Sequence, residues 1–185
     1  MALYEIVTEA DPASWHLDGF ADANDAEVDL AQFSLSKPLT FRAPLRCKVS
    51  IVGREMDFTL GPFGAWIAIR ALSQQLASLA PHDLQLVPLI VDGSPNAFDL
   101  VNVLPRLHAL DDAKSVGGRW PEGSPSAGQW LYMIHPALKA AAVDGHSLFR
   151  VHGWMPPIFC TDTVRHVLEP QEWTGLLFRR TLSAV

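Results

Sequence analysis

Ser147–Gly153 reads SLFRVHG, Ile158–Asp162 reads IFCTD and Trp173–Phe178 reads WTGLLF, and these three pieces decide the fold. Their apolar cores predict strands at Leu148–Val151, Ile158–Cys160 and Thr174–Phe178. Between the second and third strands, Thr163–Leu168 predicts a short helix. Thr161 or Asp162 can cap that helix by accepting its free amide hydrogens. The chain is therefore expected to close with strand, short helix and strand.

Strand signals dominate upstream of these pieces. Further strands are expected at Ala2–Val7, Leu45–Val52, Met56–Leu60, Leu84–Val91 and Phe98–Leu104. Gly53-Arg54-Glu55 predicts a hairpin between the second and third of these strands, and the turn formers Asp92–Asn96 allow the last two to pair. Pro88 places its strand at an edge or a bulge.

The clearest helix signal covers Trp66–Leu79, where apolar residues recur at spacings of three and four before Pro81. Loops are expected at Glu9–Asn24, which is rich in Asp, Ala and Gly, and at Lys114–Gln129, which is rich in Gly, Ser and Pro. Strands without regular βαβ alternation predict an α+β fold. We expect a mixed, largely antiparallel sheet with a few helices packed on it.

Length and composition predict one domain over residues 1–185. The chain is 49% hydrophobic and 18% charged, which allows it to bury a core and excludes a disordered segment. The N-terminus lacks a secretory signal and no stretch has the roughly 18 apolar residues of a membrane helix, so a cytoplasmic protein is expected. Cys47 and Cys160 lie in apolar sequence without CxxC spacing, which predicts buried, reduced thiols.

Charge is distributed unevenly along the chain. The net charge is −6, yet residues 1–36 carry eight acids and no Lys or Arg, which leaves 12 acids and 14 bases in the remainder. Such an acidic end repels nucleic acid and attracts a basic protein, although it also fits a solvated face that keeps the chain soluble. The residues predicted to bind a partner are Asp18, Asp22, Asp25, Glu27 and Asp29.

No catalytic, metal or cofactor motif is present in the sequence. HExxH, GxSxG and the phosphate-binding glycine patterns are missing, so neither a metal nor a cofactor is expected. His108, Asp111 and Ser115 hold the ingredients of base, acid and nucleophile within eight positions, and a small hydrolase is the alternative that they support. The structural alternative is that Asp111 or Asp112 bonds turn amides, with Ser115 extending the turn.

An ordered set of short pieces carries a resemblance to a known family. Leu86–Leu89, Asn102–Leu104 and Ala109–Ser115 precede the three closing pieces in one order. In this order the chain resembles the predicted immunity proteins of bacterial polymorphic toxin systems, first catalogued as a domain of unknown function in a myxobacterial protein. The resemblance covers residues 66–180, the family-like core, and leaves residues 1–65 as a variable acidic part.

The resemblance implies an immunity protein that binds and neutralises a cognate toxin in the producer's cytoplasm, without catalysis. A basic, nuclease-like toxin would complement the acidic part, with neither nucleic acid nor membrane as a partner. Arg150, fixed on a strand between Phe149 and Val151, needs a carboxylate or carbonyl partner when buried, and Asp111 or Asp112 is the expected one. A general protein-interaction module is a further alternative, and the oligomeric state stays open.

Overall fold

The computed structural model describes residues 1–9, 11–22 and 24–184, apart from the side chains of residues 30, 34, 63, 155, 156 and 184. Strands make up 43% of the chain and helices 16%, so the fold is a mixed-sheet architecture that is richer in strand than a typical α+β protein. The sequence predicted one mixed sheet, whereas the described residues form two large sheets and two small ones.

The largest sheet has six strands, in the order β2-β3-β6-β7-β5-β4. The strands are β2 (His16–Ala21), β3 (Leu45–Ile51), β4 (Phe58–Leu60), β5 (Trp66–Ile69), β6 (Leu84–Val91) and β7 (Phe98–Val103). Neighbours pair antiparallel except β3 and β6, which are parallel. All six residues of the central strand β7 are buried, as a strand flanked on both sides and both faces should be.

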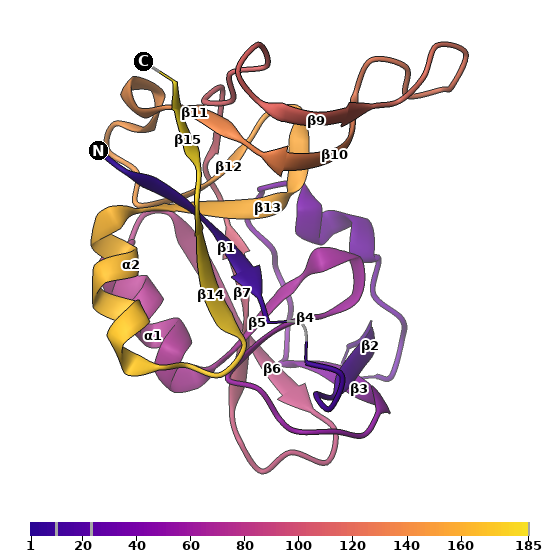
Figure 1. The fold of residues 1–185 in the computed structure, drawn as a ribbon. Coiled ribbons are helices and arrows are strands. Elements are labelled where there is room, and N and C mark those ends of the chain that lie inside the picture. The colour runs from indigo at the N-terminus through magenta and orange to yellow at the C-terminus, as the bar shows by residue number, and fades with distance from the viewer. Residues whose placement is uncertain (10, 23, 185) are drawn as a thin grey trace.

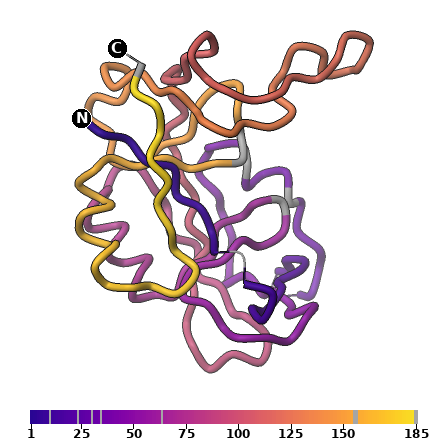
Figure 2. Tube along the Cα trace, viewed as in Figure 1, coloured from indigo at the N-terminus to yellow at the C-terminus, as the bar shows by residue number. Residues whose placement is uncertain are grey.

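The second sheet has five strands, in the order β14-β1-β13-β12-β8. The strands are β1 (Leu3–Thr8), β8 (Arg106–Leu107), β12 (Leu148–Val151), β13 (Trp154–Thr161) and β14 (Leu176–Arg180). The first strand of the chain pairs antiparallel with both β13 and β14, so the two ends of the chain run side by side (Figure 2). Residues 1–65 therefore supply strands to both large sheets.

Two α-helices lie on the same side of the molecule, α1 (Arg70–Leu79) and α2 (Asp162–Leu168) (Figure 1). Leu76 of α1 and Val164 of α2 belong to one buried cluster together with Ile6, Val101 and other residues of both large sheets. Their burial joins the two sheets into one core, because each sheet covers apolar surface that the other would leave exposed. None of the described helices is long and apolar enough to cross a membrane.

Short elements complete the chain. These are the 3₁₀ turns η1 (Leu30–Ser34), η2 (Pro62–Gly64), η3 (Ala140–Val143) and η4 (Glu169–Gln171), the parallel pair β11 (Ala137–Lys139) and β15 (Leu182–Ala184), and the antiparallel pair β9 (Val116–Arg119) and β10 (Trp130–His135). The β9–β10 pair projects from the body of the molecule (Figure 1). We call residues 116–135 the arm.

The expected strands near both ends of the chain are confirmed, and so is the short helix after Thr161. Thr161 occupies the N-cap position of α2, but its side chain makes no capping hydrogen bond. The strands β6 and β7 also pair as predicted. Pro88 lies opposite Asp99 and directly before Leu89, where pairing with β3 begins. The prediction of an edge strand or a bulge is wrong, because β6 lies between β3 and β7 and neither pairing has a register shift. Pro88 itself is paired only with β7, which a residue without an amide hydrogen tolerates.

Four further predictions are wrong. The predicted hairpin between β3 and β4 does not form, because β3 pairs with β2 and β6 while β4 pairs with β5 at the opposite edge of the sheet. The helix begins at Arg70 instead of Trp66, because Trp66–Ile69 forms β5 between β4 and β7. The two predicted loops contain β2 and β9, respectively.

Candidate functional site

Two of the five acids predicted to bind a partner shape the local backbone. Asp22 Oδ1 accepts hydrogen bonds from the amides of Asn24 (2.8 Å) and Ala26 (3.0 Å), which closes the turn after β2. Asp29 caps η1 by accepting from the amide of Ala31 at 3.0 Å. These carboxylates are already bonded to backbone amides, which explains their presence without any partner.

A third acid of that set is paired. Asp25 lies 3.0 Å from Arg46, which also bonds Asp92 at 2.9 Å, and the two carboxylates, Asp92 first, raise the pKa of the Arg46 guanidinium. Asp18 and Glu27 are exposed. The five acids thus occupy different structural environments, and contact between any of them and a partner stays a prediction.

The hydrolase ingredients are not arranged as a triad. His108 stacks on His152, with ring centroids 3.8 Å apart and planes within 3°. The Ser115 hydroxyl donates to the carbonyl of Asp111 at 2.7 Å and accepts from the amide of Ala137 at 3.0 Å. Asp111 Oδ1 accepts hydrogen bonds from the amides of Ala113 and Lys114 in its own turn, at 3.1 and 3.3 Å. The turn-forming alternative is confirmed, and the Ser115 proton is directed at a carbonyl instead of an imidazole.

Arg150 is buried, with 3% of its surface exposed. Burial, and then the neighbouring Arg106, lower the pKa of its guanidinium to about 10. The carboxylates expected to pair with it have other partners. Asp111 bonds its own turn, and Asp112 accepts from the indole Nε1 of Trp130 at 2.8 Å.

Asp112 fixes the base of the arm. Besides its bond to Trp130, its carboxylate lies 3.3 Å from the guanidinium of Arg119, which stacks 3.8 Å from the centre of the Trp130 ring. Trp130 and Arg119 face each other across the two strands. The three side chains therefore join the strand pair to the turn at residues 111–115 and hold the arm in a fixed direction.

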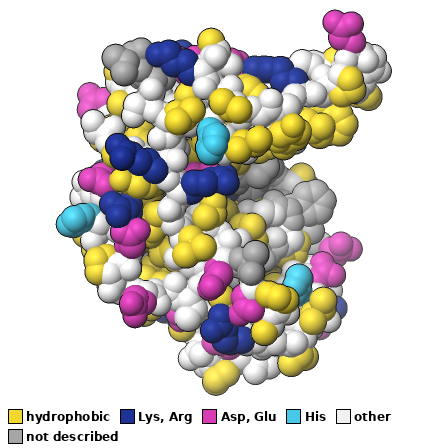
Figure 3. All heavy atoms as spheres, in the orientation of Figure 1, with side chains coloured by type: hydrophobic (Ala, Val, Ile, Leu, Met, Phe, Trp, Pro, Cys, Tyr) yellow, Lys and Arg dark blue, Asp and Glu magenta, His cyan; other side chains and the backbone are white. Residues whose placement is uncertain are grey.

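The arm exposes large apolar side chains. Five of them are 41–52% exposed, namely Val116, Trp120, Leu131, Tyr132 and Ile134. Hydrophobic surface runs along the projecting arm above a hollow in the molecular surface (Figure 3). Scattered single apolar residues are common on soluble proteins, whereas several exposed apolar side chains on one projecting strand pair, two of them aromatic, favour an interaction surface.

Two glycines allow the strands of the arm to lie close together. A Cβ on Gly117 would lie 2.3 Å from the carbonyl oxygen of Tyr132, and a Cβ on Gly118 would lie 2.5 Å from the Tyr132 ring. The tyrosine ring thus covers the strand at a position where no side chain stands in its way. The glycines that predicted a loop are instead what lets β10 approach β9.

Two cavities lie next to each other on the body of the protein, and the smaller one also borders the arm. One has a volume of about 280 Å³ and is lined by Met133 of the arm, Trp66, Trp154 and the Glu5–Arg179 ion pair, among others. The other has a volume of about 510 Å³ and lies between the ends of β1, β2 and β4. Thr8 and Leu60 line both, so the two cavities adjoin, and we call the two together the groove.

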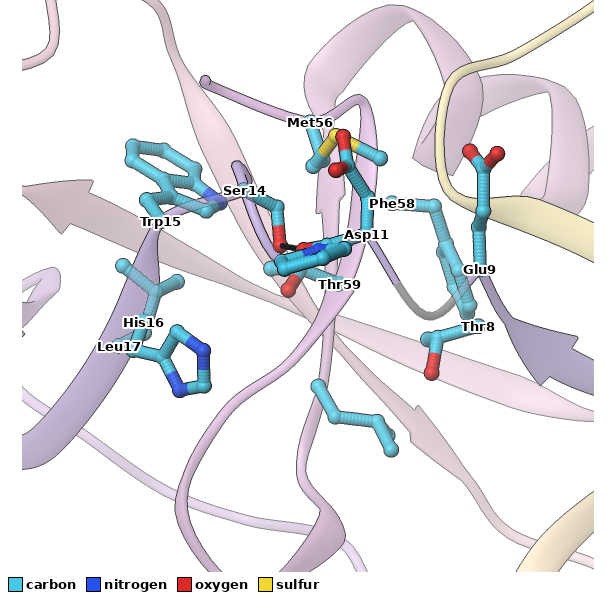
Figure 4. Close-up of a pocket in the computed structure, with 12 residues that line it drawn as sticks. Thr8, Glu9, Asp11, Ser14, Trp15, His16, Leu17, Met56, Phe58 and Thr59 are labelled. Atoms are coloured by element: carbon cyan, nitrogen blue, oxygen red, sulfur yellow. Dashed lines mark hydrogen bonds between the residues drawn. The ribbon is translucent and has the colours of Figure 1, made fainter. Parts of the chain in front are cut away.

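Figure 4 shows the larger cavity, which we call the β2 cavity. Its apolar lining includes Trp15, Met56 and Phe58, whose exposed fractions are 5%, 2% and 1%. Glu9 and Asp11 supply carboxylates to the same cavity. Asp11 is bonded to Arg54 at 2.7 Å, whereas the Glu9 carboxylate has neither hydrogen bond nor ion pair among the described residues.

The described residues contain no group of three or more His, Cys, Asp or Glu side chains that could hold a metal ion. Cys47 and Cys160 are buried and free, as predicted. Burial raises the pKa of Cys47 to about 12 and raises that of Cys160 as well. Both thiols therefore stay protonated in the core.

Neither a comparison with models of known protein families nor a comparison with curated proteins gives a match. The resemblance to immunity proteins accordingly stays a prediction.

Sequence reasoning missed both the arm and the β2 cavity. A signal for the arm was present, because Trp130–His135 is an apolar run rich in aromatic residues between Gly128 and Pro136, which is typical of a strand. The β2 cavity left no such signal. Its walls come from separate segments at residues 8–9, 11–17 and 56–60, whose strands do not pair with one another and which only the tertiary fold brings together.

Proposed function

We propose that this chain is a non-catalytic protein-binding module and that the arm is its main contact surface. The observation that carries the proposal is the group of five exposed apolar side chains on a projecting strand pair with a fixed base. Burying such a group against a partner stabilises a complex by about 25 cal/mol per Å² of apolar surface before the costs of association. Aromatic anchors at the centre of an interface contribute most of that energy.

The more specific proposal is that the partner is a toxin and that the chain is its cytoplasmic immunity protein. Two features support it, namely the order of short pieces in residues 66–180 and the acidic composition of residues 1–36. Steric blocking requires complementary surfaces and no chemistry. Asp18 and Glu27 are exposed and remain candidates for contact with a basic toxin. Asp22, Asp25 and Asp29 would add to its long-range attraction.

Co-expression tests this function. The protein encoded by the gene next to this one would be expressed in a bacterial host, alone and together with the chain. We expect the neighbour to arrest growth alone, the chain to restore growth, and the two proteins to purify as one complex. A toxic neighbour that the chain neither binds nor neutralises would contradict the immunity role. A complex with a harmless neighbour would instead favour a general interaction module.

A further inference from the structure

The β2 cavity has the size and walls of a small binding site. Its volume of about 510 Å³ falls within the roughly 300–1,000 Å³ that is usual for ligand pockets. The buried side chains of Trp15, Met56 and Phe58 form apolar walls, and the hydroxyls of Thr8 and Thr59 lie among the lining residues. Aromatic rings beside carboxylates favour an organic cation over an anion or a neutral apolar group.

The charge in this cavity is negative. Asp11 accepts from the amide of Ala13 at 2.9 Å through one oxygen and binds Arg54 at 2.7 Å through the other, so its charge is largely balanced. Glu9 is exposed and has no cationic partner among the described residues. One unbalanced carboxylate thus remains at the cavity. The Arg54–Asp11 pair shows that a guanidinium can reach a carboxylate here.

A buried hydrogen-bond donor lines the same cavity. The indole Nε1 of Trp15 is inaccessible to solvent and has no hydrogen-bond partner among the described residues. In Figure 4 the nitrogen edge of the indole is turned towards Ser14 and the other cavity residues. A buried donor without an acceptor costs about 1–3 kcal/mol, which an incoming oxygen atom would recover. The cavity therefore suits a cation that carries a carbonyl oxygen close by.

We infer that the β2 cavity receives an arginine residue of the partner protein. This inference rests on the proposed function. The guanidinium would pair with Glu9 and lie against the aromatic walls, while a carbonyl of the arginine's own peptide backbone would accept the Trp15 Nε1 hydrogen after a small shift of the ring. Arginine suits this geometry because its planar group both stacks on aromatic rings and binds carboxylates.

The groove explains why a protein segment, rather than a free amine, is the expected source of the cation. Thr8 and Leu60 line both the β2 cavity and the adjoining smaller cavity, and Met133 of the arm lines the smaller one. A partner held by the arm can therefore extend a segment along the groove into the β2 cavity. The apolar arm would supply most of the affinity, and the arginine would fix the register.

NMR titration of the ¹⁵N-labelled chain tests the inference without any toxin. The probe is Nα-acetyl-arginine methylamide, and the Trp15→Phe variant identifies the Trp15 signal among the six indole signals. We expect the probe to move the Trp15 indole signal in a saturable way. The matched neutral probe, Nα-acetyl-citrulline methylamide, should bind at least fivefold more weakly because it lacks the charge that pairs with Glu9. Agmatine, which has the cation but no carbonyl, should shift the Trp15 signal much less.

Three variants test which side chains bind the arginine probe. Glu9→Gln should weaken binding of the arginine probe about fivefold, as loss of a partly exposed charge pair does. Glu172→Gln is the matched control, since Glu172 is an exposed acid that does not line the cavity, and it should bind as the wild type does. Arg54→Gln should strengthen binding, because it frees the carboxylate of Asp11.

The inference would be overturned if the arginine probe left the Trp15 indole signal in place, or if the citrulline probe bound as tightly as the arginine probe. Equal shifts from agmatine would also overturn it and assign the cavity to free amines. These outcomes are separable from the proposed function. If the chain neutralises its neighbour but does not bind the arginine probe, the cavity inference alone fails. If the probe binds but no complex forms with a toxic neighbour, the immunity function fails.

Discussion

The indole Nε1 of Trp130 donates a 2.8 Å hydrogen bond to the carboxylate of Asp112, and this bond joins the arm to the body of the protein. Trp130 is 8% exposed, while its neighbours Leu131 and Tyr132 are 43% and 52% exposed. One strand thus combines a buried anchor with exposed apolar side chains. An anchored, exposed apolar surface loses little conformational entropy when a partner covers it.

Replacing Asp112 with alanine should loosen the arm. The Trp130 indole and the Arg119 guanidinium would both lose their shared carboxylate. Because Asp112 is largely exposed, we expect the free energy of unfolding to fall by only about 1 kcal/mol. Hydrogen exchange of the β9 and β10 amides should nevertheless accelerate. Glu122→Ala at the exposed tip of the arm is the matched control, and equal exchange in both variants would argue against the anchoring role.

The two arm glycines should differ in their tolerance of alanine. Gly117→Ala would place a methyl group 2.3 Å from a backbone oxygen, which cannot move without breaking the strand pair. Gly118→Ala would meet the Tyr132 ring, which can rotate away. We therefore expect limited proteolysis of the arm to be about tenfold faster in Gly117→Ala, which corresponds to about 1.4 kcal/mol of local opening, and to change little in Gly118→Ala. The reverse order would contradict the pairing of β9 with β10.

Several strands were readable from the sequence, but of their pairings only that of β6 with β7 was predicted correctly. β6 and β7 were predictable because a short turn-forming segment joins two apolar runs. β3 and β4 carry the same kind of signal, yet they lie far apart in the sheet, because β6, β7 and β5 come between them. Nothing local encodes that separation, which burial of the central strand β7 requires.

Trp66–Ile69 illustrates a second limit of sequence reasoning. Its apolar spacing fits the period of the following helix, but Trp66, Ile67 and Ala68 are 4% exposed or less and pair with strands on both sides. Periodicity cannot separate a short buried strand from a helical turn. The same holds for function, since the groove depends on residues that only the tertiary fold brings together.

A buried carboxylate links the two large sheets. Asp83, just before β6, is 3% exposed and accepts from the amides of Ser147 (2.6 Å) and Leu148 (3.0 Å), while His146 Nδ1 lies 2.7 Å from it. Asp83→Ala would leave the buried amide of Leu148 and the partly buried amide of Ser147 without their acceptor. We expect a loss of about 3 kcal/mol in the free energy of unfolding, measured by denaturant titration.

The matched control for Asp83 is Asp162→Ala. The Asp162 side chain is 51% exposed and pairs with Arg165 at 3.4 Å. Its removal should cost less than about 1 kcal/mol. Equal losses in the two variants would show that the Asp83 bonds do not hold the sheets together.

The buried thiols should make stability depend on alkaline pH. Burial, followed by Asp18 and Asp92, raises the pKa of Cys47 from 9.0 to about 12. The unfolded chain therefore releases this proton first, and the contribution of Cys47 to stability is complete below pH 9.0 and is lost as pH rises towards about 12. The stability of Cys47→Ala relative to wild type should accordingly improve across this range. A constant difference between the two proteins from pH 8 to 11 would contradict the raised pKa.

The central claim is that the arm binds the partner. The most direct test compares the wild-type chain with the double variant Leu131→Ser/Ile134→Ser in affinity for the toxic neighbour, by titration calorimetry. Both side chains are more than 40% exposed, so the free energy of unfolding of the variant should lie within about 0.5 kcal/mol of the wild-type value. We predict that its affinity falls at least a hundredfold, which corresponds to about 2.7 kcal/mol. Unchanged affinity in a folded variant would contradict the claim.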